Sequence, residues 1–279
     1  GLHEWVSPGI DVCVSNDNQY HLLFLSPSIE AVYSGELIFV ELIDNDWNYH
    51  TLSTAASNWS YPTIITYDLN SDYVFSFEEE SGFLVSRHRQ DSEWEKSIIA
   101  EEINQRRKII ADYDEDNHIH LVYAQYSEHE NDMITYALKE DGEYINQISF
   151  FNASNPSMDV DSTGHMHIIY LDNNEKLIYA TNESGEFVTD ELTDEYCDGS
   201  ESLCIDVNDN VHIIHSGYRY DSAVETYYLY KIGGVWTSEK LVNGYKDILE
   251  MAIDHENVLH ALMNINGSLV HLTREIEAE

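Results

Sequence analysis

Histidine returns at one position of a short phrase that repeats along the chain. The clearest copy is Asp161-Ser-Thr-Gly-His-Met-His167-Ile-Ile-Tyr170, and copies begin 45 to 53 residues apart. Five copies carry the imidazole, at His21, His120, His167, His212 and His260. Imidazole can ligate a metal ion or relay a proton. Equivalent residues of a repeat protein contact only neighbouring repeats, so we expect these histidines to stabilise the framework and not to meet in one site.

The turn that precedes the repeated histidine is rich in aspartate and asparagine. The segments 112–117 and 206–210 offer the oxygen ligands that calcium prefers. Neither has the glycine and the late glutamate of an EF-hand loop, and Asp and Asn side chains also stabilise tight turns by bonding their own backbone. We expect turn chemistry here, with no metal and no cofactor; a Ca²⁺ site is the alternative.

Long connections distinguish alternate repeats. Segments 26–35, 125–132 and 216–225 are longer than the corresponding segments of the other repeats. Their aromatic and charged side chains suit recognition of a polar, ring-shaped ligand such as a sugar. The candidate ligand-binding residues are Glu30, Tyr33, Tyr126, His129, Tyr218, Arg219, Tyr220 and Asp221. The alternative is that these loops are solvated and bind nothing.

Basic residues are scarce, since 13 Lys and Arg face 52 Asp and Glu. Arg87 and Arg89 share one predicted strand, and 106–108 form a basic link. Their guanidinium groups could bind a carboxylate ligand, but local ion pairs with the many acids are the expected role. The net charge of −39 repels phosphates and anionic lipids, so we expect no nucleic acid and no membrane insertion. A solvated surface explains this charge, with a cationic partner as the alternative.

Four short strands in each repeat must position these residues. Segments rich in Ile, Val, Tyr and Phe alternate with turns of Asp, Asn, Gly and Ser. No segment shows a sustained apolar period of 3.6 residues, so little or no helix is expected. Four strands in a repeat of about 40–50 residues are typical of a β-propeller blade. The sequence therefore predicts an all-β, six-bladed β-propeller with four-stranded antiparallel blades. A single domain over 1–279 is expected, with blades near 8–54, 60–100, 106–151, 155–194, 201–243 and 248–279.

The last repeat lacks an aromatic fourth strand. Aromatic residues open this strand in the other repeats, at Trp47, Trp94, Tyr144, Phe187 and Trp236. Their spacing places the next one just past residue 279, and Trp5 in the segment 2–7 can take its place. We expect this N-terminal strand to complete the last blade and so leave no free sheet edge.

The three cysteines do not suit a four-ligand zinc site. Cys13 is expected to be a buried apolar residue. Cys197 and Cys204 flank an expected loop between blades and could close a small disulfide, or both could remain free.

The repeated phrase D-x-x-G-x-x-H-I-x-Y, followed by L-x-Y-A and G-x-W, resembles repeats of secreted bacterial and archaeal β-propellers. The residues 161–170, 177–180 and 185–187 carry this resemblance, which lies at repeat level within the sialidase-like, BNR-like superfamily. It implies an extracellular or cell-surface protein, and the sequence carries no signal peptide. Such propellers include lectins and polysaccharide-active enzymes. The sialidase box S-x-D-x-G-x-x-W is not reproduced, because the segment from Ser15 lacks its Gly and Trp.

These observations favour a non-enzymatic propeller that binds carbohydrate or a partner protein on the long-loop face. The sequence has no nucleophile elbow, P-loop or dinucleotide fingerprint. The alternative is a carbohydrate-active enzyme, either a glycoside hydrolase with two facing carboxylates or a lyase using His129, Tyr218 and Arg219. A structural subunit of a surface array is a further alternative.

Overall fold

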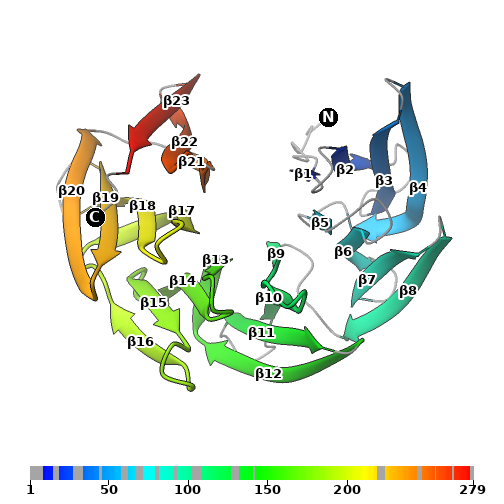
Figure 1. Cartoon of the computed structure of the whole chain (residues 1–279), viewed down its shortest axis with the longest axis horizontal. Helices are drawn as coiled ribbons and strands as arrows, with labels where there is room; N and C mark the ends of the chain where they lie inside the picture. The colour runs from blue at the N-terminus through cyan, green and yellow to red at the C-terminus, as the bar shows by residue number, and fades with distance from the viewer. Residues whose placement is uncertain are drawn as a thin grey trace, which may run out of the picture. The chain divides into compact units, whose positions relative to one another are not determined.

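The chain folds into antiparallel sheets, and the described residues contain no helix (Figure 1). The computed structural model describes residues 9–14, 19–27, 34–43, 46–57, 62–66, 72–78, 82–90, 93–101, 108–126, 132–140, 142–218, 224–243, 247–254, 256–265 and 267–276. They form two compact units, one over 1–113 and 117–150 and the other over 114–116 and 151–279. The all-β prediction is confirmed, and the described residues contain no apolar helix of membrane-spanning length.

The first unit contains the strands of the first three repeats. The first repeat comprises β1 (Ile10–Val14), β2 (Tyr20–Pro27), β3 (Ser34–Ile43) and β4 (Asp46–Ser57). The second comprises β5 (Thr63–Thr66), β6 (Asp72–Glu78), β7 (Phe83–Gln90) and β8 (Glu93–Ala100). The third comprises β9 (Ile109–Tyr113), β10 (Ile119–Tyr126), β11 (Asp132–Glu140) and β12 (Glu143–Phe151). In each repeat the strands pair in sequence order.

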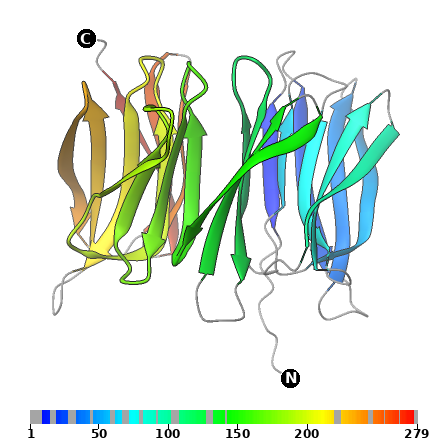
Figure 2. The same cartoon turned by 90° about the horizontal axis from the view of Figure 1, so that it is seen from below.

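The second unit contains the other three repeats. The fourth comprises β13 (Ala153–Val160), β14 (Met166–Asp172), β15 (Leu177–Thr181) and β16 (Val188–Glu191). The fifth comprises β17 (Tyr196–Ile205), β18 (Val211–Tyr218), β19 (Glu225–Ile232) and β20 (Val235–Asn243). The sixth has three described strands, β21 (Asp247–Ile253), β22 (Val258–Ile265) and β23 (Ser268–Glu275). Figure 2 shows the strands of each repeat running side by side in alternating directions.

The number of sheets differs from the predicted number of blades. Five sheets form instead of six, because one residue pair, Ala56 with Glu78, joins β4 to β6 and merges the first two repeats. Apart from that pair, each repeat keeps its own antiparallel ladder. The segment 2–7, expected to complete the last blade, lies outside the described residues.

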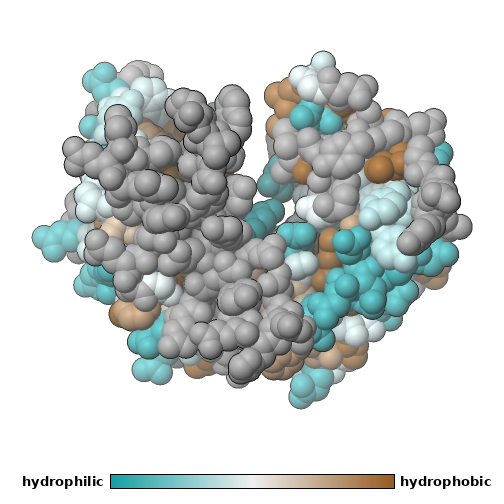
Figure 3. All heavy atoms as spheres, turned by 180° about the vertical axis from the view of Figure 1, so that it is seen from behind, coloured by the Kyte–Doolittle hydropathy of each residue, from teal (hydrophilic) through white to brown (hydrophobic). Residues whose placement is uncertain are grey.

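Apolar faces of neighbouring repeats pack against each other within each unit. Between the fourth and fifth repeats, Ile169 and Tyr179 meet Ile213 and Leu229 in one buried cluster. Each fully buried side chain of this size contributes about 1.5–3 kcal/mol. Apolar side chains also remain exposed beside hydrophilic ones on the described surface (Figure 3).

An aspartate on the innermost strand links neighbouring repeats in both units. The Asp159 carboxylate in β13 accepts a hydrogen bond from the Ile205 backbone N–H in β17 at 2.7 Å. In the first unit, the Asp11 carboxylate in β1 accepts one from the Ile64 N–H in β5 at 2.9 Å. A bond from a backbone N–H to an aspartate of the preceding repeat therefore occurs in both units, so neighbouring repeats are joined by polar contacts as well as by apolar packing.

Candidate functional site

The structure describes the side chain of one predicted ligand-binding residue, Tyr218. Tyr126 ends β10, and its side chain lies outside the described residues. The other predicted residues also lie outside them: Glu30, Tyr33, His129, Arg219, Tyr220 and Asp221. The site is therefore built around Tyr218, at the end of β18 where the long connection of the fifth repeat begins.

A pair of stacked tyrosines marks this end of the fifth repeat. Tyr196 and Tyr218 are paired across β17 and β18, and their ring centroids lie 5.7 Å apart. Both side chains are half-buried. The Lys176 ammonium lies 4.7 Å from the centre of the Tyr196 ring, within cation–π range. The pair thus offers partly exposed aromatic surface with a cation beside it.

The fourth repeat contributes a carboxylate to the same place. The Tyr218 hydroxyl donates a hydrogen bond to Glu175 Oε2 at 3.2 Å. Glu175 lies in the turn between β14 and β15 with a φ of 58°. Its backbone carbonyl accepts a hydrogen bond from the Cys197 N–H at 2.8 Å, which fixes the turn against β17. Two repeats of the same unit therefore build the cluster together.

A second tyrosine and carboxylate lie beside the pair, where β19 begins. The Tyr227 hydroxyl donates to Glu225 Oε2 at 2.5 Å, and Lys240 forms an ion pair with the same carboxylate. The hydrogen bond with Glu225, partial burial and the nearby Glu195 together raise the pKa of Tyr227. A Cβ at Gly217 would lie 3.2 Å from Glu195 Oε2, so glycine lets this carboxylate approach the strand. We call the set Glu175, Lys176, Glu195, Tyr196, Tyr218, Glu225, Tyr227 and Lys240 the tyrosine–carboxylate cluster.

A buried histidine lies beneath this cluster. The His215 ring stacks on Tyr227 with a centroid distance of 5.4 Å, and its Nδ1 lies 3.6 Å from Cys197 Sγ. Burial lowers the pKa of His215 to about 4, so the imidazole is neutral at neutral pH. Because His215 is buried and the pKa of Tyr227 is raised, neither side chain is suited to take a proton from a bound ligand. Stacking surface, carboxylates and hydroxyls suit binding of a polyhydroxylated ring.

Four of the five repeated histidines are buried and His260 is half-buried, and all but His21 bond side chains of their own repeat. Three of them bond a tyrosine hydroxyl through Nδ1: His120 to Tyr136 at 3.0 Å, His167 to Tyr179 at 2.6 Å and His212 to Tyr228 at 2.6 Å. His260 and His21 instead pair with Asp254 at 2.9 Å and with Asp72 at 2.7 Å. This is the structural arrangement that repetition predicted.

The aspartate-rich segments form tight turns, as expected. Asp161 Oδ1 accepts hydrogen bonds from the backbone N–H groups of Thr163 and His165, and the Gly164 N–H bonds the Asp161 carbonyl. Burial alone would raise the pKa of Asp161, but these hydrogen bonds outweigh it and lower the pKa to about 2. The fourth residue of the phrase has a positive φ in four copies: Asn117 at 64°, Gly164 at 81°, Asp209 at 61° and Asn257 at 61°.

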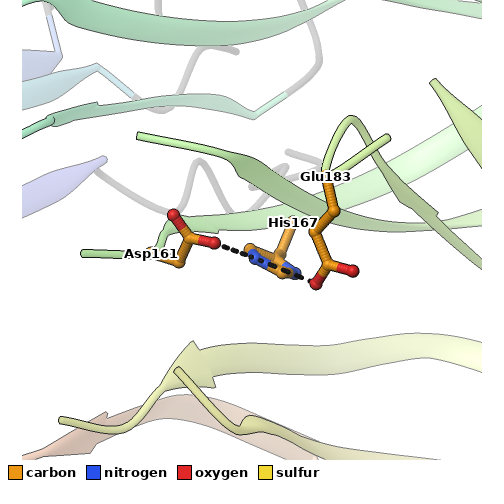
Figure 4. Close-up of side chains that lie close together, drawn as sticks. All are labelled: Asp161, His167 and Glu183. Atoms are coloured by element: carbon orange, nitrogen blue, oxygen red, sulfur yellow. Dashed lines mark hydrogen bonds and ion pairs between the residues drawn. The ribbon is translucent and has the colours of Figure 1, made fainter. Parts of the chain in front are cut away.

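Asp161, His167 and Glu183 have ligand atoms within 4.8 Å of one another and could in principle bind a metal ion (Figure 4). Asp161 already accepts two backbone hydrogen bonds, and Lys231 lies 3.6 Å from Glu183 Oε2. A cation at that distance opposes binding of a second one. The Asp–His contact also recurs in other repeats, as between Asp206 and His212 at 3.4 Å. We therefore assign this triad to the framework.

Arg87 and Arg89 form ion pairs inside the first unit. Arg89 contacts Glu41 and Asp72 at 2.5 Å each, and Arg87 pairs with Glu78. Both guanidinium groups are buried. They neutralise acids of their own unit, which is the expected role.

The cysteines form no disulfide. Cys13, Cys197 and Cys204 each keep an unbridged thiol. The expected loop between Cys197 and Cys204 is instead part of β17, so the two residues lie at opposite ends of one strand. Seven residues of strand span about 20 Å, far beyond the reach of a disulfide. The disulfide alternative is therefore wrong.

No protein-family profile and no curated protein sequence match this chain. Among solved structures, a fucose-specific lectin from Aleuria aurantia has a similar fold, with a TM-score of 0.59 and 12% sequence identity. The similarity covers 97% of this chain and 95% of the lectin chain. The SapL1 lectin in complex with α-methyl fucoside matches 97% and 93%, with a TM-score of 0.58 and 11% identity. An ulvan lyase, a polysaccharide lyase of a new family, matches 94% and 79%, with a TM-score of 0.61 and 10% identity. At these identities the likeness shows a shared fold, that of β-propellers.

Proposed function

We propose that this protein is a non-enzymatic β-propeller that binds carbohydrate through its long-loop face. The tyrosine–carboxylate cluster carries the proposal, because it combines stacked aromatic rings with hydrogen-bonding groups from two repeats. Tyr218 is the proposed contact in this cluster, and the other residues predicted from the sequence stay candidate contacts: Glu30, Tyr33, Tyr126, His129, Arg219, Tyr220 and Asp221. The lectin folds found by comparison are compatible with this function.

The charge of the chain narrows the class of glycan. Glu175, Glu195 and Glu225 outnumber Lys176 and Lys240 in the cluster, and the chain has a net charge of −39. Such a surface repels polysaccharides that carry carboxylate or sulfate groups. A neutral glycan avoids this repulsion, and its hydroxyls can donate to the glutamates. We propose a neutral glycan as the ligand.

We further propose that the chain is one six-bladed domain closed by the segment 2–7, and that it acts outside the cell or at its surface. The innermost strand β1 supports closure. Asp11 and Cys13 of β1 pack towards the second repeat, whereas Ile10, Val12 and Val14 alternate with them and are 68%, 58% and 51% exposed. A sixth blade beside the first would cover this apolar face, as neighbouring repeats cover each other elsewhere.

A glycan array with the labelled full chain tests the function, followed by calorimetric titration of the best neutral glycan. Tyr218→Ala should weaken binding at least roughly tenfold, about 1.4 kcal/mol, because it removes the stacking surface and the Glu175 bond. Tyr49→Ala is the matched control, since Tyr49 is an exposed tyrosine in β4 of the first unit. Parental affinity in Tyr218→Ala would contradict the site, and cleavage of the bound glycan would contradict the non-enzymatic role.

A further inference from the structure

A pocket of about 360 Å³ lies between the outer strands of the fourth and fifth repeats. It is lined by residues 190–192 at the end of β16, residues 236–238 of β20 and Leu229 of β19. Figure 1 shows β16 and β20 as the outermost strands of their sheets. Glu225 of the tyrosine–carboxylate cluster pairs with Asn243 at the far end of β20, so the pocket and the cluster are separate.

The charged residues that line the pocket, Asp190 and Glu191, are both acidic. Both are exposed, and neither carboxylate forms a hydrogen bond or an ion pair within the described part of the chain. Asp190 pairs with Tyr179 across β15 and β16, and Tyr179 belongs to the buried cluster shared with the fifth repeat. Burial and then the charges of Glu183 and Asp190 raise the pKa of Tyr179. The Asp190 side chain therefore lies on the face of the fourth repeat that meets the fifth.

This pair of acids is particular to the fourth repeat. The third and fourth residues after the aromatic that opens the fourth strand are both acidic only there, at Asp190 and Glu191. The corresponding pairs in the other repeats are His-Thr, Ser-Ile, Gln-Ile and Glu-Lys. Because the fold of the other repeats does without them, the two acids are free to serve a role outside the framework.

Trp236 forms an aromatic wall of the pocket. The residue is half-buried, but its indole Nε1 is buried. A ligand in the pocket therefore meets the carbon surface of the ring and not the N–H. Leu192 and Leu229 extend this apolar surface. Aromatic surface beside a negative charge is the chemistry that recognises ammonium ions, including quaternary ones.

Tyrosine rings of the same unit already hold cations of the chain. Lys176 lies 4.7 Å from the centre of the Tyr196 ring, and Lys231 lies 5.1 Å from that of Tyr179. Trp236 has no such cation among the described residues, and no basic residue lines the pocket. Lys231 pairs with Trp236 across β19 and β20, but its charge is compensated by Glu183 at 3.6 Å. The two carboxylates of the pocket thus lack the cation that comparable places in this unit have.

A metal ion or a neutral sugar fits this lining less well. Calcium takes about six to eight oxygen ligands, and the group of three close metal-ligating side chains among the described residues lies elsewhere, at 161, 167 and 183. A neutral sugar could bond Thr237 and Ser238, but it would leave both carboxylates uncompensated. An anion would be repelled by them.

We propose that this pocket binds a small organic ammonium ion, whose charge is compensated by Asp190 and Glu191 and whose carbon-bound hydrogens contact Trp236. The site goes beyond the proposed long-loop site and does not depend on it. It also gives the acidic surface a specific partner in one place.

The test follows the indole N–H signals of the full chain labelled with ¹⁵N-tryptophan. The chain has five tryptophans, and Trp236→Phe identifies the signal of interest. Choline and n-butylammonium are titrated to millimolar concentrations at constant ionic strength. The matched neutral probe is 3,3-dimethylbutan-1-ol, which has the shape of choline without its charge, and methyl glucoside is the sugar probe.

At least one of the two cations should move the Trp236 signal in a saturable manner. The neutral isostere should bind at least roughly tenfold more weakly than choline, a difference of about 1.4 kcal/mol. No movement with either cation would overturn the proposal. Equal binding of the isostere would show an apolar pocket without charge recognition, and movement with methyl glucoside alone would show a sugar pocket; either result would also overturn it.

Two variants separate the pocket from general charge effects and from the long-loop site. Asp190→Asn with Glu191→Gln changes exposed side chains and should weaken cation binding at least roughly tenfold. Glu93→Gln with Glu95→Gln removes the same charge from exposed positions of β8 and should leave binding unchanged. Equal losses in the two double variants would overturn the pocket. Tyr218→Ala should leave the cation titration intact, and its loss there would mean that the Trp236 signal reports the long-loop site.

Discussion

Burial changes the acid–base behaviour of His215. Its ring is enclosed by the Cys197 thiol and the Tyr227 ring, and burial lowers its pKa to about 4. An exposed histidine titrates near 6.5. The folded protein therefore resists protonation of His215, whereas the unfolded chain accepts the proton readily. This difference links the stability of the fifth repeat to pH.

We expect the free energy of unfolding to decrease as pH falls from about 6.5 to 4, because the unfolded state binds more protons there. The His215 contribution is fully present above 6.5, and its loss reaches about 3 kcal/mol below 4. His215→Gln should flatten this dependence in urea unfolding measured at several pH values. His271→Gln, at an exposed ring, is the control and should keep the parental slope. An unchanged slope in His215→Gln would contradict the assignment.

The sequence identified part of the candidate site. Tyr218 was predicted because it lies in the segment 216–225, which is longer than the corresponding segments of alternate repeats. Tyr196 and Glu175 were missed. Tyr196 meets Tyr218 across a bulged ladder, and Glu175 reaches Tyr218 from the preceding repeat. These contacts depend on strand register and on packing between repeats, which residue types alone do not reveal.

At the scale of elements, the first unit contains a buried ion network. Arg89 of β7 pairs with Glu41 of β3 and with Asp72 of β6, and Asp72 also pairs with His21 of β2. The Arg89 guanidinium lies 5.1 Å from the centre of the Phe39 ring. The network joins strands of two repeats, so it ties the first repeat to the second.

Arg89→Met should destabilise the protein by about 3–5 kcal/mol, because it leaves two buried carboxylates without their cation. Chemical unfolding of the full chain measures this loss. Lys240→Met removes one partner of a more exposed pair with Glu225 and should cost at most about 1 kcal/mol. Equal losses in the two variants would show that burial does not strengthen the Arg89 network.

Bulges are the feature of the strands that the sequence did not predict. In β17 the register shifts between Cys197 and Glu201, so residues expected in a loop extend the strand. A bulge adds a residue without a strong local sequence signature. The disulfide alternative failed for this reason, whereas strands with regular alternation were placed close to their observed positions.

At the scale of the whole molecule, repetition made the fold predictable. Copies of one phrase placed nearly all the strands, and each repeat forms its own ladder as expected. Closure into a ring of six stays a prediction, since it depends on the segment 2–7. The prediction rests on the spacing of the aromatic residues that open the fourth strands, and no observed contact enters it.

Deleting residues 1–7 should lower the melting temperature substantially, because an open sheet edge and an uncovered aromatic position would remain. Differential scanning calorimetry of the truncated and full chains measures the change. Deleting residues 277–279 is the control for chain shortening and should have little effect. A chain without residues 1–7 that melts like the parent would contradict closure by the N-terminal strand.

The left-handed position in the repeated turn has a consequence for how the repeats diverge. Asn117, Gly164, Asp209 and Asn257 all occupy it with a positive φ. These are the residue types that tolerate this conformation best. In the genetic code, one base change converts an Asn codon to an Asp codon, and one more converts Asp to Gly. Each copy of the turn can therefore drift among these three residues in single mutational steps, while its backbone and the histidine that follows it stay in place.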